Sequence, residues 1–133
     1  MKEVFADTFY FLALLNPSDE AYSQVQKISV GQGRRLITTA WVLTELANAL
    51  SKQSLRARFI STFTALKSTQ SVEIIGPDQR LFDAGVQLYE VRPDKDWSLT
   101  YCISFVVMKE RGTTEALTGD RHFEHAGFRA LLS

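Results

Sequence analysis

The chain has 133 residues, 45% of them hydrophobic, with 15 basic and 15 acidic side chains. This length suggests one domain spanning residues 1–133, and the balanced charge argues against nucleic-acid binding driven by net charge alone. A single cysteine excludes an intramolecular disulfide, and no run of 18 apolar residues or signal-peptide pattern is present. The composition therefore predicts a cytoplasmic protein without a membrane span.

The first predicted element is a short strand that begins almost at the N-terminus and ends on Asp7. Helical spacing of apolar residues follows at once and predicts a helix over residues 9–15, which Asn16-Pro17 ends. Ser18 or Asp19 is expected to cap a second helix carrying Tyr22, Val25 and Ile28, with Gly31 and Gly33 as its stop signal.

Strands and helices then alternate to the end of the chain. Short apolar runs predict strands at residues 36–37, 72–75, 115–118 and, as a last edge strand, 128–132. Helical spacing predicts helices at residues 40–51, 55–66, 79–89, 99–110 and a turn of helix through residue 123. A polar loop is expected at residues 91–97. The helix over 99–110 is apolar on nearly every side, so we expect its own fold or a partner chain to bury it.

This alternation predicts parallel strands joined by crossover helices. We therefore expect an α/β fold, a three-layer α/β/α sandwich with a mostly parallel central sheet of four or five strands. No internal repeat and no linker divides the chain. No glycine-rich phosphate loop follows the first strand, which disfavours dinucleotide and P-loop functions. The third strand lacks a terminal acid, which disfavours a phosphoacceptor signalling domain.

Four acids are predicted to meet at one edge of this sheet. Asp7 ends the first strand, Asp120 follows the fourth, Glu45 lies on the helix after the second, and Asp96 precedes the buried helix. Because the carboxyl ends of parallel strands share one edge, these carboxylates would repel one another unless a cation balanced them. Mg²⁺ or Mn²⁺ prefers oxygen ligands and can activate water beside a phosphoryl group. The acids therefore favour phosphodiester chemistry.

Each acid also has a purely structural interpretation. Asp7 could cap the following helix, and Asp120 could form an Asx-turn with the preceding glycine. Glu45 could be solvated at the edge of its helix. Asp96, with its neighbour Asp94, could pair with the loop cations Arg92 and Lys95. A zinc pair formed by His122 and His125 is disfavoured, because no third ligand lies at suitable spacing.

Four stretches carry a resemblance to a known family: Phe5-Ala6-Asp7-Thr8, the residues from Thr44 to Leu50, those from Asp96 to Phe105, and those from Leu117 to Phe123. They look like a PIN domain. The resemblance implies a small α/β/α sandwich, Mg²⁺- or Mn²⁺-dependent ribonuclease activity on an RNA substrate and, as in VapC-type toxins, a homodimer inhibited by a small antitoxin. Asp7, Glu45 and Asp120 match the family's first, second and fourth acids, and Thr118 matches its hydroxyl residue.

One position departs from the family pattern. The third acid of the family usually stands in the first turn of the buried helix, where this sequence has Tyr101. A phenol is a poor ligand for Mg²⁺ at neutral pH. Either Asp96, five residues earlier, takes the place of the missing ligand, or metal binding and catalysis are weakened or lost.

Two hypotheses follow from these residues. The first is a metal-dependent endoribonuclease whose catalytic and metal-binding residues are Asp7, Glu45, Asp96 and Asp120. In this hypothesis three nearby cations bind the RNA backbone: Arg92, Lys95 and Arg121. The second is a non-catalytic PIN-like module that acts through RNA or protein binding. The apolar surface of the helices over residues 41–50 and 55–66 further predicts a homodimer.

Overall fold

The computed structural model describes residues 2–28 and 33–133 of the chain. Within these ranges five strands form one sheet in the order β3-β2-β1-β4-β5, and every neighbouring pair is parallel. The strands are β1 (Lys2–Ala6), β2 (Arg34–Thr39), β3 (Val72–Ile75), β4 (Glu115–Leu117) and β5 (Arg129–Ala130). The predicted α/β architecture with a mostly parallel sheet is confirmed.

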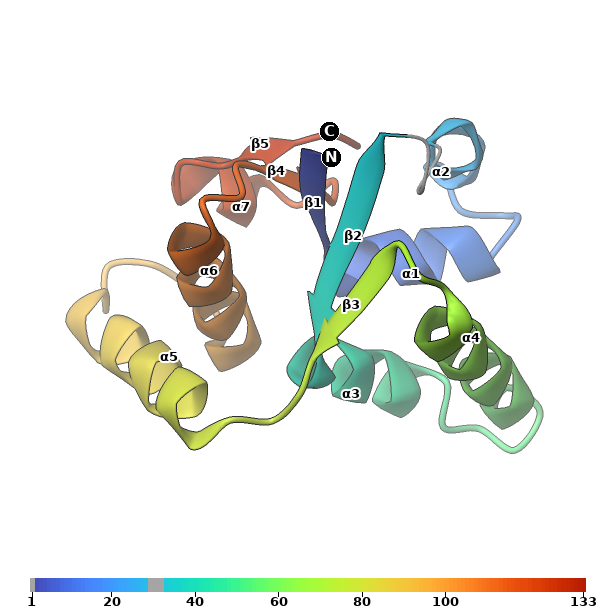
Figure 1. Cartoon of the computed structure of the whole chain (residues 1–133), viewed down its shortest axis with the longest axis horizontal. Helices are drawn as coiled ribbons and strands as arrows, with labels where there is room; N and C mark the ends of the chain where they lie inside the picture. Colours follow the sequence, from blue (N-terminus) through green and yellow to red (C-terminus); the bar gives the residue numbers. More distant parts are fainter. Residues whose placement is uncertain (1, 29–32) are drawn as a thin grey trace.

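Seven helices connect the strands in the described ranges. They are α1 (Thr8–Leu15), α2 (Tyr22–Lys27), α3 (Ala40–Ala49), α4 (Arg56–Ser68), α5 (Gln79–Val91), α6 (Leu99–Arg111) and α7 (Arg121–His125). In Figure 1, α5 and α6 lie to the left of the strands, whereas α1, α2 and α4 lie to their right. None of the helices in the described ranges is long and apolar enough to cross a membrane.

Strand β1 lies at the centre of the sheet and sets the position of the later site. Phe5 is in register with Ile37 of β2 and with Ala116 of β4, and Ala6 pairs with Leu117. Because all strands run the same way, the loops after β1, β2 and β4 leave the sheet at the same edge. Residues that follow these strands are therefore brought together although they are far apart in sequence.

Local capping residues begin or end two of the predicted helices, those expected over residues 79–89 and 99–110. The side chain of Ser98 accepts a hydrogen bond from Tyr101 N at 3.1 Å and begins α6, and Asp78 begins α5 in the same way. Gly112 ends α6 with φ of 67°, a left-handed conformation that glycine adopts without steric cost. These caps act over three or four residues, which is why sequence reasoning finds them.

Two predicted elements differ from the structure. Neither Ser18 nor Asp19 caps α2; the side chain of Asp19 instead accepts a hydrogen bond from Ala21 N at 2.9 Å, so it forms a turn before the helix. The helix ends at Lys27, and the predicted stop at Gly31 lies outside the described residues. The last strand is shorter than the predicted 128–132, because β5 pairs with β4 only at Arg129 and Ala130.

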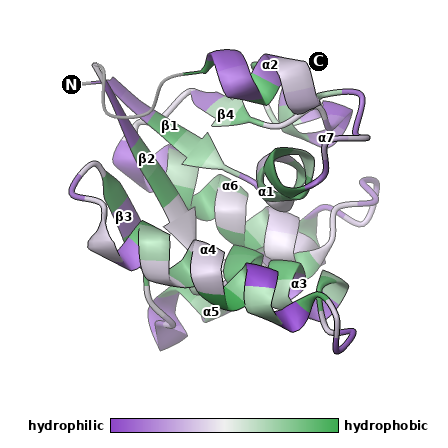
Figure 2. Cartoon of the chain, turned by 90° about the vertical axis from the view of Figure 1, so that its right-hand side faces the viewer, coloured by the Kyte–Doolittle hydropathy of each residue, from purple (hydrophilic) through white to green (hydrophobic). Residues whose placement is uncertain are grey.

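The core is continuous from the central strands into helix α6. Figure 2 shows β1 beginning in a hydrophilic colour and becoming hydrophobic towards its carboxyl end, whereas β2 begins hydrophilic and ends in a pale, intermediate colour. Helix α6 buries six residues, as its nearly all-round apolar pattern predicts: Cys102, Ile103, Ser104, Phe105, Val107 and Met108. It packs directly against α5, where Gly85 lies so close to α6 that an added Cβ would stand 2.3 Å from Ile103 Cγ1. This tight contact fixes α6 and, with it, Tyr101.

Candidate active site

Asp7 lies between β1 and α1 and is almost completely buried, with 2% of its surface exposed. It occupies the N-cap position of α1, but its side chain makes no capping hydrogen bond. Instead its Oδ2 accepts a hydrogen bond from the Thr118 hydroxyl at 3.0 Å. The purely structural interpretation of Asp7 as a helix cap is therefore incomplete, because its carboxylate is turned towards the end of β4.

The second oxygen of Asp7 is chemically unusual. Oδ1 is buried and has no hydrogen-bond partner among the described residues. The pKa of Asp7 is raised from 3.8 to about 6, mainly by burial and also by the charges of Glu45 and Asp120, against hydrogen bonding from the Thr118 side chain and the Thr8 backbone. A buried carboxylate with a free oxygen is costly unless it is protonated or bound by a cation.

Glu45 reaches the same region from helix α3. Its side chain is half-buried, and Oε1 accepts a hydrogen bond from the Thr8 hydroxyl at 2.7 Å. This contact joins α3 to the first residue of α1, next to Asp7. Glu45 is thus held by a specific partner rather than solvated at the edge of its helix, and its charge acts on Asp7.

Asp120 follows β4 and is held by three hydrogen bonds. Its backbone N donates to the Thr118 hydroxyl at 3.1 Å, and its Oδ1 accepts from His122 N at 2.8 Å as the cap of α7. Its Oδ2 accepts a hydrogen bond from the hydroxyl of Tyr101. The neighbouring Gly119 leaves no room for a side chain, because an added Cβ would stand 2.5 Å from the ring of Phe9.

Tyr101 is held by aromatic neighbours on several sides. Its ring stacks on Phe105 with centroids 6.1 Å apart, meets Phe123 edge-on at 5.7 Å, and lies 5.4 Å from His122. Burial raises the pKa of its hydroxyl well above the usual value, and the bond to Asp120 and the charges of Asp7, Asp120 and Glu45 act in the same direction. The hydroxyl is therefore a neutral group among three carboxylates.

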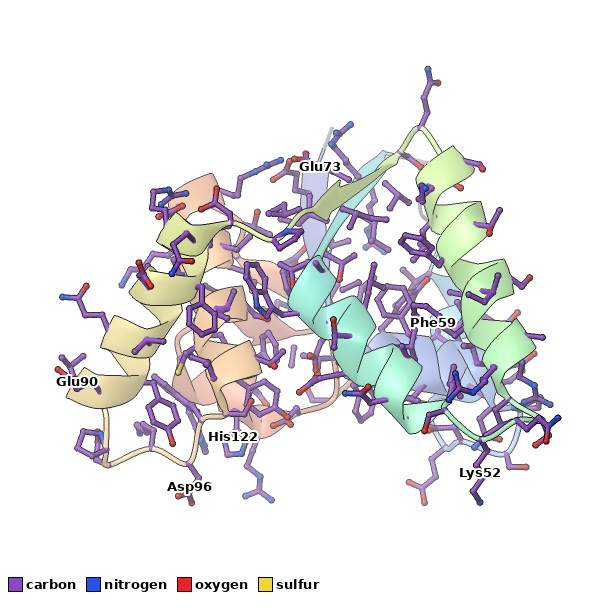
Figure 3. All side chains as sticks on the ribbon, turned by 90° about the horizontal axis from the view of Figure 1, so that it is seen from below. Lys52, Phe59, Glu73, Glu90, Asp96 and His122 are labelled. Atoms are coloured by element: carbon purple, nitrogen blue, oxygen red, sulfur yellow. The ribbon has the colours of Figure 1, made fainter. Side chains whose placement is uncertain are left out.

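Asp96 is not gathered with the other three predicted site acids. It is exposed, and it lines a cavity of about 690 Å³ together with Arg92, Lys95 and Trp97. Figure 3 shows its side chain pointing outward from the loop before α6. Because the charges that act on Asp7 and Tyr101 come from the other three acids, Asp96 as placed does not substitute for the missing third ligand. Its use as a ligand would require the loop to turn inward.

The loop before α6 contains one of the ion pairs that the structural interpretation of its acids predicts. Arg92 pairs with Asp94 at 3.0 Å, and its guanidinium lies over the Trp97 ring at 5.2 Å, so this cation is engaged within the loop. His122 and His125 have ring centroids 6.2 Å apart. In the described part of the chain, no three His, Cys, Asp or Glu side chains lie close enough to hold a metal ion.

The donor chemistry nevertheless fits a hard divalent ion. Asp7 Oδ1 is a buried carboxylate oxygen without a partner, and the nearby charges of Glu45 and Asp120 would be offset by a cation. At Asp120, by contrast, Oδ2 accepts the hydrogen bond from the Tyr101 hydroxyl. Asp7 and Glu45 are the residues that would hold such an ion, with the charge of Asp120 beside them.

Comparison with known structures identifies the fold. VapC20 from Mycobacterium tuberculosis, a sarcin–ricin loop cleaving toxin, matches with a TM-score of 0.83 and 22% sequence identity, over 94% of this chain and 95% of VapC20. FitAcB from Neisseria gonorrhoeae matches with a TM-score of 0.65 and 14% identity, over 96% and 94% of the two chains. This chain has the PIN-domain fold. No protein-family model matches it, and no curated protein matches significantly in sequence.

The contacts within the site differ in how far the sequence predicts them. Thr118 is a predicted site residue, and its hydroxyl joins the Asp7 side chain to the Asp120 backbone. The contact between Thr8 and Glu45 was not predicted, although a hydroxyl directly after a strand-end acid is a usable signal. The contact between Tyr101 and Asp120 could not be predicted, because it depends on where α6 and α7 lie relative to each other.

Proposed function

We propose that this protein is a Mg²⁺- or Mn²⁺-dependent endoribonuclease that hydrolyses RNA phosphodiester bonds, and that it is the toxin of a toxin–antitoxin pair. The observation that carries the proposal is the unpartnered, buried Oδ1 of Asp7 beside the charges of Glu45 and Asp120. The PIN fold that the chain shares with VapC20 supports the toxin assignment. A small antitoxin protein and a second copy of the chain are the partners we propose.

The residues of the site have distinct roles in this proposal. A divalent ion held by Asp7 and Glu45, beside the charge of Asp120, would polarise a water molecule and offset the charge on the scissile phosphate. Thr118 orients Asp7 through a hydrogen bond to Oδ2, which leaves Oδ1 free. Thr8 orients Glu45 in the same way. Arg121 is exposed directly after Asp120, and we propose that it contacts the RNA backbone.

A melting experiment tests whether the site binds an ion. A ligand that binds only the folded state stabilises it by mass action, by about 2.7 kcal/mol at a concentration 100 times its dissociation constant. We expect the melting temperature of the full chain to rise with added Mn²⁺, and RNA to be cleaved in Mn²⁺ but not in EDTA. The absence of both responses would contradict the metal-dependent function.

A second candidate function is favoured by the contact between Tyr101 and Asp120. Because this hydroxyl engages a carboxylate oxygen of the site, a PIN-like module that binds RNA or protein without cleaving RNA is the alternative. Such a module would bind a labelled RNA equally well in EDTA and in Mn²⁺ and would leave the RNA intact. The proposed nuclease instead converts the same RNA to shorter products when Mn²⁺ is added.

A further inference from the structure

Both carboxylate oxygens of Asp120 are already in use within the protein. Oδ1 accepts a hydrogen bond from His122 N at 2.8 Å, and Oδ2 accepts one from the Tyr101 hydroxyl. Asp7 differs, because its Oδ1 is buried and accepts no hydrogen bond from the described residues. The site therefore offers an ion an oxygen without a hydrogen bond at Asp7, whereas each oxygen of Asp120 already accepts one.

The Tyr101 hydroxyl cannot easily be moved away from Asp120. Its ring is packed against Phe105, Phe123 and His122, with centroids 5.4 to 6.1 Å away. Its backbone N is fixed by the Ser98 cap at the start of α6. A side chain held in one rotamer by packing on several sides leaves that rotamer only at the cost of those contacts.

A neutral phenol is also a poor substitute for a carboxylate towards a hard cation. It brings no negative charge, and Mg²⁺ and Mn²⁺ prefer charged oxygen ligands. A second ion at Asp120 would have to displace the hydrogen bond from Tyr101, and Tyr101 itself would offer that ion no charged ligand in return.

We propose that Tyr101 limits the site to a single divalent ion, held on the side of Asp7 and Glu45, because it keeps Asp120 as its own hydrogen-bond partner. This inference rests on the proposed function. Tyr101 is thus a positioning residue that acts through Asp120. Removing the hydroxyl while keeping the ring frees Asp120 Oδ2, and replacing the ring by a carboxylate adds a further charged ligand at the same place.

The stoichiometry of Mn²⁺ binding to the full chain, measured by calorimetric titration, tests this inference independently of catalysis. We expect one Mn²⁺ per parent chain and two per chain for Tyr101→Phe and Tyr101→Asp. We also expect the paramagnetic resonance spectrum of both variants to show two coupled Mn²⁺ ions, which distinguishes adjacent ions from an unrelated surface site. Tyr22→Phe is the matched control. Tyr22 is half-buried on α2, which lies near the start of β2 and away from the carboxyl ends of the strands, where the site lies (Figure 1).

The outcomes separate the inference from the proposed function. Two ions in the parent, or one ion in both Tyr101 variants, would overturn the inference and leave the metal-dependent nuclease standing. Binding of no ion by the parent or any variant would overturn the proposed function and the inference together. Tyr101→Phe keeps the aromatic contacts, so we expect it to fold even if Tyr101→Asp does not. Circular dichroism checks the folding of both variants.

Discussion

At the scale of single residues, Asp7 combines deep burial with an unpartnered oxygen. Burial raises its pKa to about 6, although Thr118 donates a hydrogen bond to its other oxygen. In the absence of a cation, the ionised carboxylate therefore lowers the stability of the folded chain near neutral pH. A residue that costs stability in this way and yet ends the central strand is a candidate for function rather than for folding.

Replacement of Asp7 by asparagine tests the catalytic part of this interpretation. The amide keeps the shape of the side chain but lacks the charge that a hard cation needs, so we expect Asp7→Asn to fold and to lose RNA cleavage. The loss should be at least the roughly 10- to 100-fold that supporting residues of metal sites typically cost. Asp83→Asn, an exposed substitution on α5, is the matched control. Cleavage by Asp7→Asn at the parent rate in Mn²⁺ would show that Asp7 is no ligand.

The raised pKa of Asp7 also predicts how stability depends on pH without metal. Between pH 3.8 and about 6 the folded state holds a proton that the unfolded state releases, so the unfolding free energy should fall as pH rises through this window. The full difference corresponds to about 3 kcal/mol. Denaturant titrations in EDTA from pH 4 to 7 should show this fall in the parent and a smaller one in Asp7→Asn. Parallel curves for the two proteins would contradict the prediction.

At the scale of elements, helix α6 places Tyr101 in the site. Ser98 caps its first turn, Gly112 ends it, and six buried residues fix its rotation about its own axis. Its contact with α5 is close because Gly85 has no side chain where it meets Ile103. The position of the Tyr101 hydroxyl thus depends on how closely two helices approach one another as well as on the local sequence.

Adding a methyl group at this helix contact should loosen it. In an exposed helix Gly→Ala gains about 1 kcal/mol, but here the new Cβ would lie 2.3 Å from Ile103 Cγ1 and 3.3 Å from the Ile103 backbone. We expect Gly85→Ala to lower the unfolding free energy by about 1–2 kcal/mol, because overpacking outweighs helix propensity.

A double-mutant cycle shows whether that loss arises at the helix contact. In an Ile103→Ala background, Gly85→Ala should cost less than it does in the parent, because the clashing side chain is gone. Gly76→Ala is the control, since no atom within 4 Å would meet its added Cβ. An equal loss of unfolding free energy in both backgrounds would show that the effect does not arise from the contact with Ile103.

At the scale of the whole molecule, the exposed apolar side chains do not lie mainly where the dimer prediction places them. Helix α3 buries Val42, Leu43 and Leu46, and Phe59 of α4 packs against the core, between α3 and α4 in Figure 3. On α4 only Ile60 is a large hydrophobic residue with high exposure within the described ranges. Four others are exposed along α5: Phe82, Val86, Tyr89 and Val91. The homodimer itself stays a prediction.

Sedimentation of paired variants tests both the dimer and its location. We expect the parent to sediment as a dimer of the 15.0 kDa chain at micromolar concentration. Val86→Lys combined with Tyr89→Lys should shift it to the monomer, because charges would enter an apolar contact. Ile60→Lys on α4 should leave the dimer intact if α5 forms the interface. A parent that sediments only as a monomer would refute the dimer.

The local features of this protein follow from short stretches of its sequence. Strand β1 and its terminal acid, the caps at Asp78 and Ser98, and the end of α6 at Gly112 all depend on residues a few positions apart. Their energies arise within a single turn or strand, so they can be predicted without knowing the neighbours in space. The alternation of such elements also determined the parallel α/β architecture.

The contacts that the site acids make depend on packing between elements that are distant in the sequence. The contact of Thr118 with Asp7 joins residues 111 positions apart, and that of Thr8 with Glu45 joins residues 37 positions apart. Whether Tyr101 or Asp96 lies in the site depends on how α6 packs on α5 and where α7 begins. These contacts form between elements whose distance and rotation are set by the packing of the whole core, which no local pattern in the sequence specifies.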